Sequence, residues 1–562
     1  MIQLKYLSLF VFTLILISCN DTKKEEANVD FAKLETPLVS SNFTWAGANI
    51  YFLLTDRFNN GDISNDINFD RNNEAAVLRG FEGGDIKGVT QKIKEGYFTK
   101  LGVNAIWMTP VVEQIHDGTD EGTGYTYGYH GYWTKDWTSM DPNFGTREDL
   151  QELVATAHNN GIRIILDAVI NHTGPVTEKD TVWPAEWVRT SPKCIYKSYE
   201  TTITCTLVEN LPDILTESNK AVDLPPQLVA KWKVEGRYEK EIAELDAFFT
   251  RTGHPRASRF YIMKWLTDYI TDFGIDGYRV DTVRHTEEYV WEEFRKECDH
   301  AFGLWKETNP SLAMDDTPFY MVGEVGTYII KTGQEYDFGD RKVNYFNESF
   351  DALINFDLRT TGDKSYEDVF SNYSDILNTE MSGFGTLNFL SSHDENNPFD
   401  KARKKTYETA IRLLLTPGTS QIYYGDEVGR TLLIEGTTGD ATLRSAMNWD
   451  DINNNLEMQK LMEHWQKLGQ FRNRHMAVGA GVHKMIAESP YTFSRRYTKG
   501  DHEDKVVVAL DVSQDKKNIS VSNVFEDGTK LKDAYSGKEM IVEKGSVIFS
   551  SVFDVVLLEL NN

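Results

Sequence analysis

Short apolar runs alternate with longer amphipathic stretches between about residues 45 and 473. The apolar runs predict strands at 48–54, 105–108, 162–169, 277–280, 319–322, 385–389 and 421–424. The stretches between them predict helices at 88–101, 147–159, 258–273, 289–302 and 401–415. Strand–helix alternation over about 430 residues predicts an α/β protein with a parallel sheet, and this length suits a (β/α)8 TIM barrel.

Two segments break this alternation. Residues 173–256 follow the third predicted strand and carry Pro, Cys and charged residues in no clear period, which predicts an inserted subdomain over the barrel. After His475, short apolar runs alternate with turns, which predicts a C-terminal antiparallel β-sandwich. The expected organisation is a barrel of residues 45–172 and 257–475, an inserted B subdomain of 173–256 and a sandwich of 476–562.

The first eighteen residues have the pattern of an export signal. Lys5 precedes an apolar run from Tyr6 to Ile17 that is too short to span a bilayer. The run ends in LISC, which resembles the lipobox of bacterial lipoproteins and implies acylation of Cys19. Residues 19–44 are polar and predict a flexible tether. We expect a lipid-anchored protein of the cell envelope, outer-membrane or periplasmic, with surface display or a plain signal peptide as alternatives.

The charge and the cysteines add constraints on partners and compartment. With 86 acidic and 59 basic side chains the formal net charge is −27, so nucleic acid and anionic membrane surfaces would be repelled. A lipid anchor is therefore the only expected contact with a membrane. Export permits a disulfide between Cys194 and Cys205, whereas Cys298 falls in a helical pattern and predicts a buried free thiol.

Dense polar clusters end four of the predicted strands. They lie at 167–172 (DAVINH), 277–281 (GYRVD), 323–325 (GEV) and 393–394 (HD). One such cluster would suit an ordinary loop or helix cap. In a barrel, however, the carboxyl ends of the strands meet on one face. We therefore expect the four clusters to form one site.

The four clusters resemble the sequence regions of glycoside hydrolase family thirteen, the α-amylase family, and they extend to GYRVDTVRH at 277–285 and FLSSHD at 389–394. The resemblance covers the chain from about residue 45 onward. It implies Asp281 as nucleophile, Glu324 as general acid/base and Asp394 as third carboxylate. It also implies that the sugar at the point of cleavage is lined by Arg279, His172 and His393.

The residue types suit this chemistry. A retaining glycosidase needs one ionised carboxylate to attack the anomeric carbon and one protonated carboxyl group for the leaving oxygen, about 5–5.5 Å apart. Arg279 stands two residues before Asp281 on a strand, so it faces the same side and is expected to lower the pKa of the nucleophile. Glu324 must hold its proton near neutral pH, which predicts surroundings that are less polar or negatively charged.

An aromatic segment lies upstream. Residues 128–133 read GYHGYW and resemble the YHGYW segment of the same family. The likeness implies that Tyr132 stacks on the sugar at the cleavage subsite, with Trp133 beside it and His130 nearby. A cluster of packed core aromatics is the alternative.

Calcium is the cofactor that the resemblance implies. Asn171, Asp213 and the carbonyl group of His285 match the family's ion between barrel and inserted subdomain, and hard oxygen ligands suit Ca²⁺. Cys194 and Cys205 precede Asp213 as a disulfide does in fungal α-amylases. A second calcium loop, similar to that of cyclodextrin glucanotransferases, is implied by Asn60, Asp62, Asn65, Asp66, Gly83 and Asp85, although such stretches also form plain turns.

Within the family, the sequence favours hydrolysis of α-1,4 bonds in starch, glycogen or malto-oligosaccharides. Arg284 and His285 resemble the Lys-His pair of α-1,4-acting members and are expected to bind glucose on the leaving side. Glu209 stands where cyclising transferases carry an aromatic residue, four positions before Asp213. A neopullulanase- or cyclomaltodextrinase-like hydrolase or transglycosylase is the alternative.

A non-enzymatic glucan-binding surface protein is a second alternative. Such a protein typically lacks the nucleophile or the acid, and this chain has all three carboxylates. The lipid anchor also suggests glucan-uptake proteins at the cell surface as partners.

Overall fold

Eight parallel strands close into a barrel in the computed structural model, which describes residues 43–561. The expected signal peptide, Cys19 and the first part of the tether lie outside the described residues. Around the barrel the strands follow one another in chain order, and the last pairs with the first. They are β1 (Asn49–Leu53), β2 (Ala105–Met108), β7 (Arg163–Ala168), β10 (Gly277–Val280), β11 (Tyr320–Gly323), β14 (Ala352–Asn355), β15 (Gly385–Asn388) and β16 (Thr419–Tyr423).

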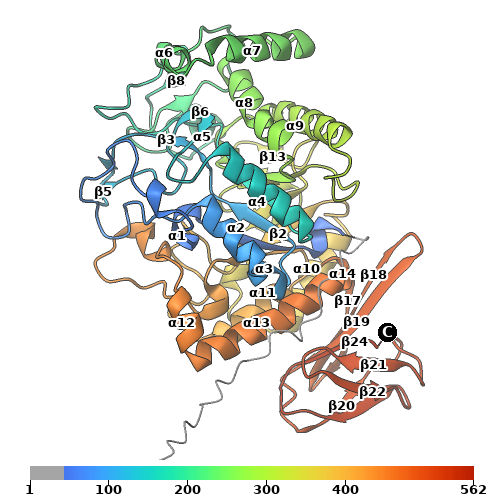
Figure 1. Cartoon of the computed structure of the whole chain (residues 1–562). Helices are drawn as coiled ribbons and strands as arrows, with labels where there is room; N and C mark the ends of the chain where they lie inside the picture. Colours follow the sequence, from blue (N-terminus) through green and yellow to red (C-terminus); the bar gives the residue numbers. More distant parts are fainter. Residues whose placement is uncertain (1–42, 562) are drawn as a thin grey trace, which may run out of the picture. The chain divides into compact units, whose positions relative to one another are not determined.

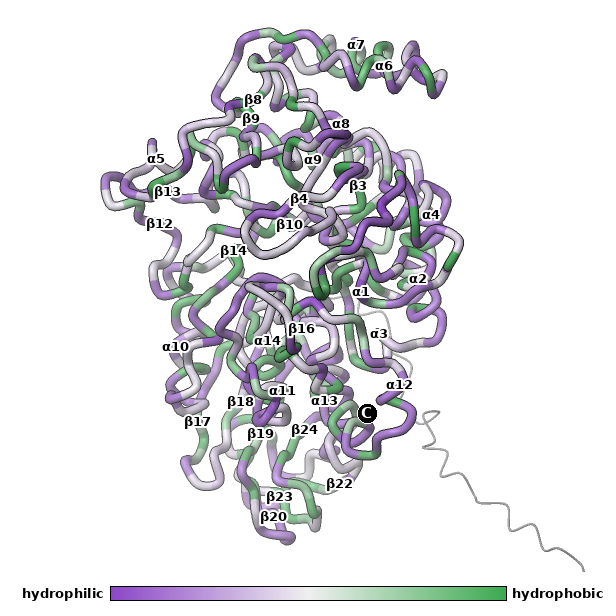
Figure 2. Tube along the Cα trace, turned by 90° about the vertical axis from the view of Figure 1, so that its left-hand side faces the viewer, coloured by the Kyte–Doolittle hydropathy of each residue, from purple (hydrophilic) through white to green (hydrophobic). Residues whose placement is uncertain are grey.

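Amphipathic helices cover the outside of the barrel (Figure 1). Their starts and stops follow local chemistry: α4 begins with a capping box between Thr146 and Asp149, and α8 ends at Gly274, whose φ of 72° suits glycine. Hydrophilic and hydrophobic residues alternate along helices such as α4 (Arg147–Asn159) and α7 (Tyr238–Thr252) (Figure 2). The main helices are α2 (Ile86–Lys94), α4 (Arg147–Asn159), α8 (Ser258–Phe273), α9 (Glu288–Thr308), α10 (Tyr366–Asn378), α11 (Thr406–Leu415) and α13 (Leu456–Arg474).

The barrel, its insertion after the third barrel strand and the C-terminal antiparallel sheet confirm the predicted fold class. Some elements differ from the prediction. The helix predicted at 88–101 is two helices, because Gly96 (φ 74°) separates α2 from α3 (Tyr97–Lys100). The sixth barrel strand, β14, was not predicted from the sequence, because it has only four residues and follows a long loop. The helix α10 that follows it was missed as well.

The insertion between β7 and α8 contains more regular structure than its sequence indicates. Two short strands, β8 (Val188–Arg189) and β9 (Asp213–Ile214), pair antiparallel, and two helices follow, α6 (Pro226–Val234) and α7 (Tyr238–Thr252). The predicted disulfide between Cys194 and Cys205 is present, and Cys298 is a buried free thiol as expected.

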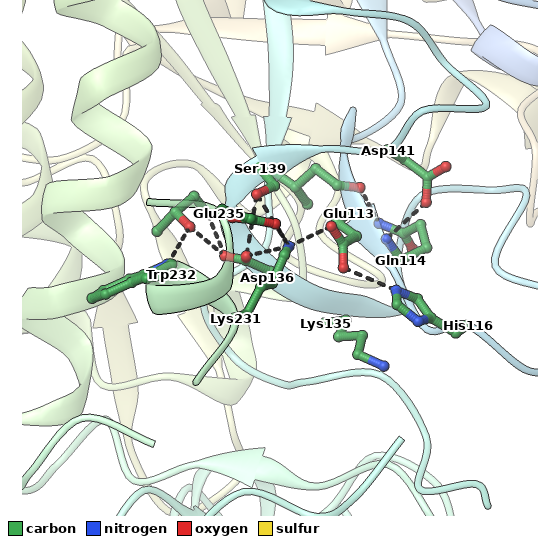
Figure 3. Close-up of polar contacts among 12 residues, drawn as sticks. Glu113, Gln114, His116, Lys135, Asp136, Ser139, Asp141, Lys231, Trp232 and Glu235 are labelled. Carbon is green, nitrogen blue, oxygen red and sulfur yellow. Dashed lines mark hydrogen bonds and ion pairs between the residues drawn. The ribbon is translucent and has the colours of Figure 1, made fainter. Parts of the chain in front are cut away.

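A partly buried ammonium group fixes the insertion to the barrel (Figure 3). Lys231 of α6 donates to Glu113 at 2.5 Å and to Asp136 at 2.6 Å, and these carboxylates lie on the paired strands β3 (Val112–Gln114) and β6 (Thr134–Met140). Arg237 adds an ion pair to Asp136, and Trp232 donates to Thr138. Because both carboxylates are buried, loss of the ammonium group would leave uncompensated charges, so these contacts specify where the insertion docks.

The C-terminal segment forms an antiparallel sheet of six strands and a separate pair, with a small apolar core of its own. The sheet order is β17 (Val482–Glu488), β18 (Tyr491–Lys499), β19 (His502–Leu510), β24 (Val556–Leu560), β21 (Lys530–Asp533) and β22 (Lys538–Ile541). Strand β20 (Lys516–Ser520) pairs with β23 (Ser546–Ser550). Two buried guanidinium groups bind the C-terminal end of α11, one from the barrel helix α13 and one from this segment. Arg472 of α13 donates to the Leu414 carbonyl group at 3.0 Å, and Arg495 of β18 (Tyr491–Lys499) donates to that of Leu415 at 2.8 Å. Both carbonyl groups belong to the end of α11, where the helix dipole attracts cations.

Within residues 43–561, no helix combines the length and apolar character that a bilayer crossing requires.

Candidate active site

The carboxyl ends of adjacent barrel strands bring the predicted clusters together. Arg279 of β10 lies beside Asp167 of β7 in register, and Val280 of β10 lies beside Gly323 of β11. Asp281 and Glu324 each follow directly, so they leave their strands at the same level. Their amides continue the ladder, because Asp281 donates to the Ala168 carbonyl group and Glu324 to that of Val280.

A single buried guanidinium group contacts three carboxylates. Arg279 Nη1 lies 2.9 Å from Asp167 Oδ1 and 2.8 Å from Asp281 Oδ1, and Nη2 lies 2.8 Å from Glu324 Oε2. Asp281 and Glu324 therefore lie on the two nitrogens of one planar group. This proximity suits a retaining pair, in which about 5–5.5 Å separates the carboxyl groups, rather than the wider inverting arrangement.

A strained residue helps to hold Glu324 in place. Thr282 follows Asp281 directly and has a φ of 51°, in the left-handed region that non-glycine residues rarely adopt. Its amide donates to Glu324 Oε2 at 3.2 Å. The backbone amide that follows Asp281 thus binds the carboxylate of Glu324.

The pKa values of the two carboxyl groups are separated. Burial raises the pKa of Glu324 to about 8, and the negative charges of Asp281 and Asp394 add to the rise, while Arg279 opposes it. Burial also raises the pKa of Asp281, but only to about 6, because Arg279 opposes that rise strongly. Between these values Asp281 is ionised and Glu324 is protonated, which is the assignment that a nucleophile and an acid require.

The pKa of Asp281 departs from the sequence-based expectation in its net direction. The expected effect of Arg279 is present, because its charge lowers the pKa. Burial and the neighbouring Asp167 outweigh that charge, so the net direction is upward. The expectation was wrong because it included the charge partner and omitted desolvation.

Asp394 follows β15 and is the exposed member of the carboxylate group. Its pKa is lowered: partial desolvation within the site opposes the shift, but the interactions with His393, Arg279 and Arg444 outweigh it. Asp394 therefore presents an ionised carboxylate to the site at neutral pH. Its charge is one of the causes of the raised pKa of Glu324.

The predicted histidines are neutral hydrogen-bonding groups. Burial lowers the pKa of His172 and of His393 to about 4 and that of His285 to about 3, and it also lowers that of His130. The formal positive charge at the carboxylates therefore comes from arginine. Neutral imidazoles can donate to and accept from sugar hydroxyl groups without disturbing the charge balance of the carboxylates.

The Tyr132 ring packs near two imidazole rings. Its centroid is 5.9 Å from that of His130 and 5.3 Å from that of His393, with small interplanar angles. The Tyr132 hydroxyl group donates to Asp167 Oδ2 at 2.8 Å, which ties this stack to the arginine cluster. Trp133 is 6 % exposed and packs against Ile115 and Leu211, so most of its ring belongs to the core.

A cavity of about 760 Å³ opens beside this stack. Three of its lining residues were predicted site residues, namely His130, Tyr132 and Trp133. Others carried no sequence signal, because they come from loops far apart in the chain: Arg79 forms an ion pair with Asp440 at 3.0 Å, and Arg444 donates to the His393 carbonyl group at 2.8 Å. The remaining lining residues are Thr119, Asp120, Glu121, Gly122, Thr123, Thr126, Lys193, Val208, Glu209 and Asn210.

Arg284 and His285 were also predicted to bind substrate, but they do not line this cavity. Arg284 Nη1 donates to the Gly326 carbonyl group at 3.0 Å and to the Tyr336 hydroxyl group at 2.9 Å. His285 Nδ1 lies 2.9 Å from the Thr202 carbonyl oxygen in the insertion. His285 therefore joins the barrel to the insertion, whereas Arg284 contacts the segment that follows β11.

The residues predicted for the first calcium ion lie together. The backbone segments of Asn171 and Asp213 pair with each other, because Ile214 donates its amide to the Asn171 carbonyl group. The hydroxyl group of Thr286, the residue after His285, donates to Asn171 Oδ1 at 3.4 Å. No hydrogen-bond partner within residues 43–561 reaches Asp213 Oδ1 or Asn171 Nδ2, although both atoms are buried. Burial raises the pKa of Asp213 well above its usual value, and Arg189 contacts only its Oδ2, at 2.8 Å. An orphaned buried carboxylate oxygen beside an amide fits a hard cation.

In the second predicted calcium loop, Asp85 and Asp62 are paired with backbone amides and an ammonium group. Asp85 accepts hydrogen bonds from the amides of Gly61, Asp62 and Gly88, so it caps α2. Asp62 Oδ2 lies 2.6 Å from the Lys87 ammonium group. Each of these carboxylates therefore has a protein partner.

Asn60 in the same loop donates to Asp66 Oδ1 at 2.9 Å, and Gly83 packs against both side chains. Asn65 Oδ1 is the one oxygen of this loop that is buried without a partner among the described residues. Across the described part of the chain, no group of three or more His, Cys, Asp or Glu side chains is arranged to hold a metal ion.

Comparison with known proteins agrees with this geometry. A model of the α-amylase catalytic domain matches residues 52–481. The periplasmic α-amylase of Escherichia coli (strain K12) is 34% identical over 530 residues, which cover 84% of this chain and 72% of that protein. A cyclomaltodextrinase from a Bacillus species is 26% identical over 485 residues, which cover 82% of this chain and 72% of that protein.

The fold also has solved counterparts. The α-amylase of Geobacillus thermoleovorans, whose crystal structure is complexed with acarbose, superposes with a TM-score of 0.61 at 22% sequence identity. The match covers 93% of this chain and all of the other. At this identity the likeness shows the fold.

The separated pKa values predict a bell-shaped pH dependence of kcat/KM for a malto-oligosaccharide. The rate should fall below about pH 6, where Asp281 gains a proton, and above about pH 8, where Glu324 loses one. Because the two groups interact, the limbs report apparent values of the pair. Initial rates from pH 4 to 10 check this, and a rate that stays constant down to pH 4.5 would contradict the raised pKa of Asp281.

Proposed function

The chain belongs to the α-amylase family of glycoside hydrolases, and on that premise we propose that it hydrolyses α-1,4-glucosidic bonds with retention of configuration. The observation that carries the proposal is the contact of one guanidinium group, that of Arg279, with Asp281 and Glu324. Starch, glycogen and malto-oligosaccharides are the proposed substrates.

The proposed reaction has two displacements. An Asp281 carboxylate oxygen attacks the anomeric carbon while the Glu324 carboxyl group gives its proton to the leaving glycosidic oxygen, so a covalent glycosyl-enzyme forms and the shortened glucan departs. Glu324, now ionised, takes a proton from water, whose oxygen attacks the same carbon and releases Asp281. Two inversions give net retention.

The charge arrangement favours the transition state. An oxocarbenium-like ring carries positive charge, and the ionised carboxylates of Asp281 and Asp394 would face it from preorganised positions. Asp167 binds Arg279 and Tyr132 and so acts as a positioning residue. The neutral histidines His172 and His393 are proposed to bind sugar hydroxyl groups, with the Tyr132 ring beside the sugar face.

Hydrolysis is proposed over cyclisation because of Glu209. This residue lines the cavity beside the stack, where a charged side chain offers no apolar face on which a returning glucan end could stack. A cyclomaltodextrinase-like activity is the second candidate, and the 26% identity to such an enzyme favours testing it directly.

Chemical rescue separates the two catalytic roles. With α-maltosyl fluoride and azide, Asp281→Gly should form the inverted β-maltosyl azide, because azide takes the place of the missing nucleophile. Glu324→Gln should form the retained α-azide, because the leaving fluoride needs no acid and azide needs no base. Both variants should lose more than about 1000-fold in kcat on starch. Proton NMR of the azides reads the outcome, and interchanged anomers would reverse the assignment.

Product analysis tests the substrate class with the same variants as controls. Wild type should release mixed malto-oligosaccharides from soluble starch, and Asp281→Gly and Glu324→Gln should release none. Cleavage of pullulan or β-cyclodextrin without cleavage of starch would transfer the chain to the neopullulanase and cyclomaltodextrinase group. Binding of starch without any cleavage would support the surface-protein alternative.

We propose one calcium ion between the barrel and the insertion, held by Asn171, Asp213 and the carbonyl group of His285. When bound, the ion would supply positive charge for the orphaned oxygen of Asp213 and would link the two parts. The second loop, at Asn60, Asp62, Asn65, Asp66, Gly83 and Asp85, is proposed to hold its shape through Lys87 and backbone amides, without an ion.

Chelation tests the calcium proposal through stability. Treatment with EDTA should lower Tm by several degrees and added Ca²⁺ should restore it, because saturation at 1000 times Kd contributes about 4 kcal/mol. Asp213→Asn should have a low Tm that calcium does not change. Asp62→Asn is the matched control and should respond as wild type does. If Asp62→Asn alone lost the response, the ion would belong to the second loop.

We also propose that the chain is a lipoprotein of the cell envelope, anchored by acylation of Cys19. Similarity to a periplasmic α-amylase supports the envelope, and the LISC sequence supports the anchor. A lipid-held enzyme would release oligosaccharides next to glucan-uptake proteins, which are the proposed partners.

Radiolabelled palmitate tests the anchor in cells that express the full chain. Wild type should carry label and fractionate with membranes. Cys19→Ser should lose the label and remain active in the soluble envelope fraction. An unlabelled wild type would indicate a plain signal peptide.

A further inference from the structure

Trp107 of β2 is a buried residue that contacts Asp167, the partner of Arg279. It is 2% exposed, and its indole Nε1 donates to Asp167 Oδ2 at 3.1 Å. Two other buried tryptophans, Trp265 and Trp465, have no hydrogen-bond partner for Nε1 among the described residues, as suits side chains that only fill a core. The N–H group of Trp107 instead binds a carboxylate of the active site, which indicates a role beyond packing.

Three donors occupy the Asp167 carboxylate. Arg279 Nη1 binds Oδ1 at 2.9 Å, and the Tyr132 hydroxyl group and Trp107 Nε1 share Oδ2 at 2.8 and 3.1 Å. Burial raises the pKa of Asp167, and each of these hydrogen bonds opposes that rise, because each favours the ionised form. Trp107 therefore helps to keep a negative charge opposite Arg279.

The ring of Trp107 also contacts Arg279 directly. The guanidinium carbon of Arg279 lies 5.2 Å from the ring centroid, which is within the range of a cation–π interaction. Arg279 Nε is buried without a hydrogen-bond partner among the described residues, so the orientation of this group depends on its Nη contacts and on neighbouring rings. The Trp107 ring is itself held by Phe52 of β1, at 3.7 Å between ring centroids. It therefore limits how the guanidinium group can turn.

This support reaches both catalytic carboxyl groups through Arg279. Nη1 contacts Asp281 and Nη2 contacts Glu324, each at 2.8 Å. Because a guanidinium group is planar and rigid, a rotation that shortens one of these contacts lengthens the other. Trp107 is buried and does not line the cavity beside the tyrosine, so it can affect the carboxyl groups without binding the sugar.

We infer that Trp107 is a positioning residue, which fixes the Asp167 carboxylate through its indole N–H group and directs Arg279 at the two catalytic carboxyl groups. The inference rests on the proposed function and extends it to a residue of the barrel core. It assigns the N–H group a part in the reaction that an apolar side chain of the same size could not take. The effect should therefore appear in kcat rather than in substrate binding.

Two changes test the N–H group and the whole ring separately. Benzothienylalanine in place of Trp107 keeps the shape of the ring and replaces N–H by sulfur, so it should fold as wild type does. It should lower kcat on maltoheptaose about fivefold and change KM less than twofold. Trp107→Phe also shortens the ring and should lower kcat about 20-fold at similar KM. Both losses should recur with α-maltosyl fluoride, because attack by Asp281 is needed whichever group leaves.

A double-mutant cycle separates positioning from packing. In the Asp167→Asn background, benzothienylalanine at position 107 should lower kcat less than twofold, because the charged acceptor is already absent. Trp232→Phe is the matched control, since this buried residue donates Nε1 to the Thr138 hydroxyl group, also at 3.1 Å. It should lower Tm as Trp107→Phe does and leave kcat on both substrates within twofold of wild type.

The outcomes are distinct. Unchanged kcat with benzothienylalanine, a change in KM alone, or an equal loss of kcat with Asp167 and with Asn at position 167 would each overturn the inference. A loss of kcat in Trp232→Phe as large as in Trp107→Phe would also overturn it, because packing alone would then explain the effect. A wild-type enzyme that cleaves neither substrate would overturn the proposed function itself.

Discussion

One buried guanidinium group compensates the charge of three carboxylates at the centre of this protein. Arg279 is fully enclosed, and each of its contacts with Asp167, Asp281 and Glu324 is shorter than 3 Å. Without it, three acidic groups would face one another in a site of low polarity, and most would take up protons. The geometry depends on register, because β7, β10 and β11 place these residues at one level. The barrel thus supports chemistry by holding neighbouring strand ends in fixed alignment.

Much of this arrangement could be predicted from the sequence, and the part that could not has physical causes. The clusters after the strands at 163–168 and 277–280 are local, so their residues were found and the structure brings them together. Arg79, Asp440 and Arg444 were not found, because they meet only when loops more than 300 residues apart fold together. The direction of the Asp281 pKa was missed because desolvation depends on the surrounding packing.

The insertion could likewise be predicted from the sequence only in part. Its disulfide could be predicted, since two nearby cysteines and export suffice for the argument. Its docking could not, because the contacts of Lys231 with Glu113 and Asp136 join segments about 100 residues apart. Polar groups of the insertion and of the barrel segments therefore define where the insertion docks. The pattern of apolar residues alone would not define this position.

The closure of the barrel has a consequence for how the chain is made. β1 pairs with β16 in a register that begins with Asn49 opposite Ser420. The first barrel strand therefore cannot complete its hydrogen bonding until the last one has been synthesised. During synthesis roughly 370 residues must emerge before that edge finds its partner, and until then its backbone groups remain open to other chains. A ribosome-bound intermediate of this protein thus cannot close the barrel until β16 has emerged. The free edge of β1 therefore lacks its partner for longer than the edge of any other barrel strand, because the others pair with the next barrel strand along the chain.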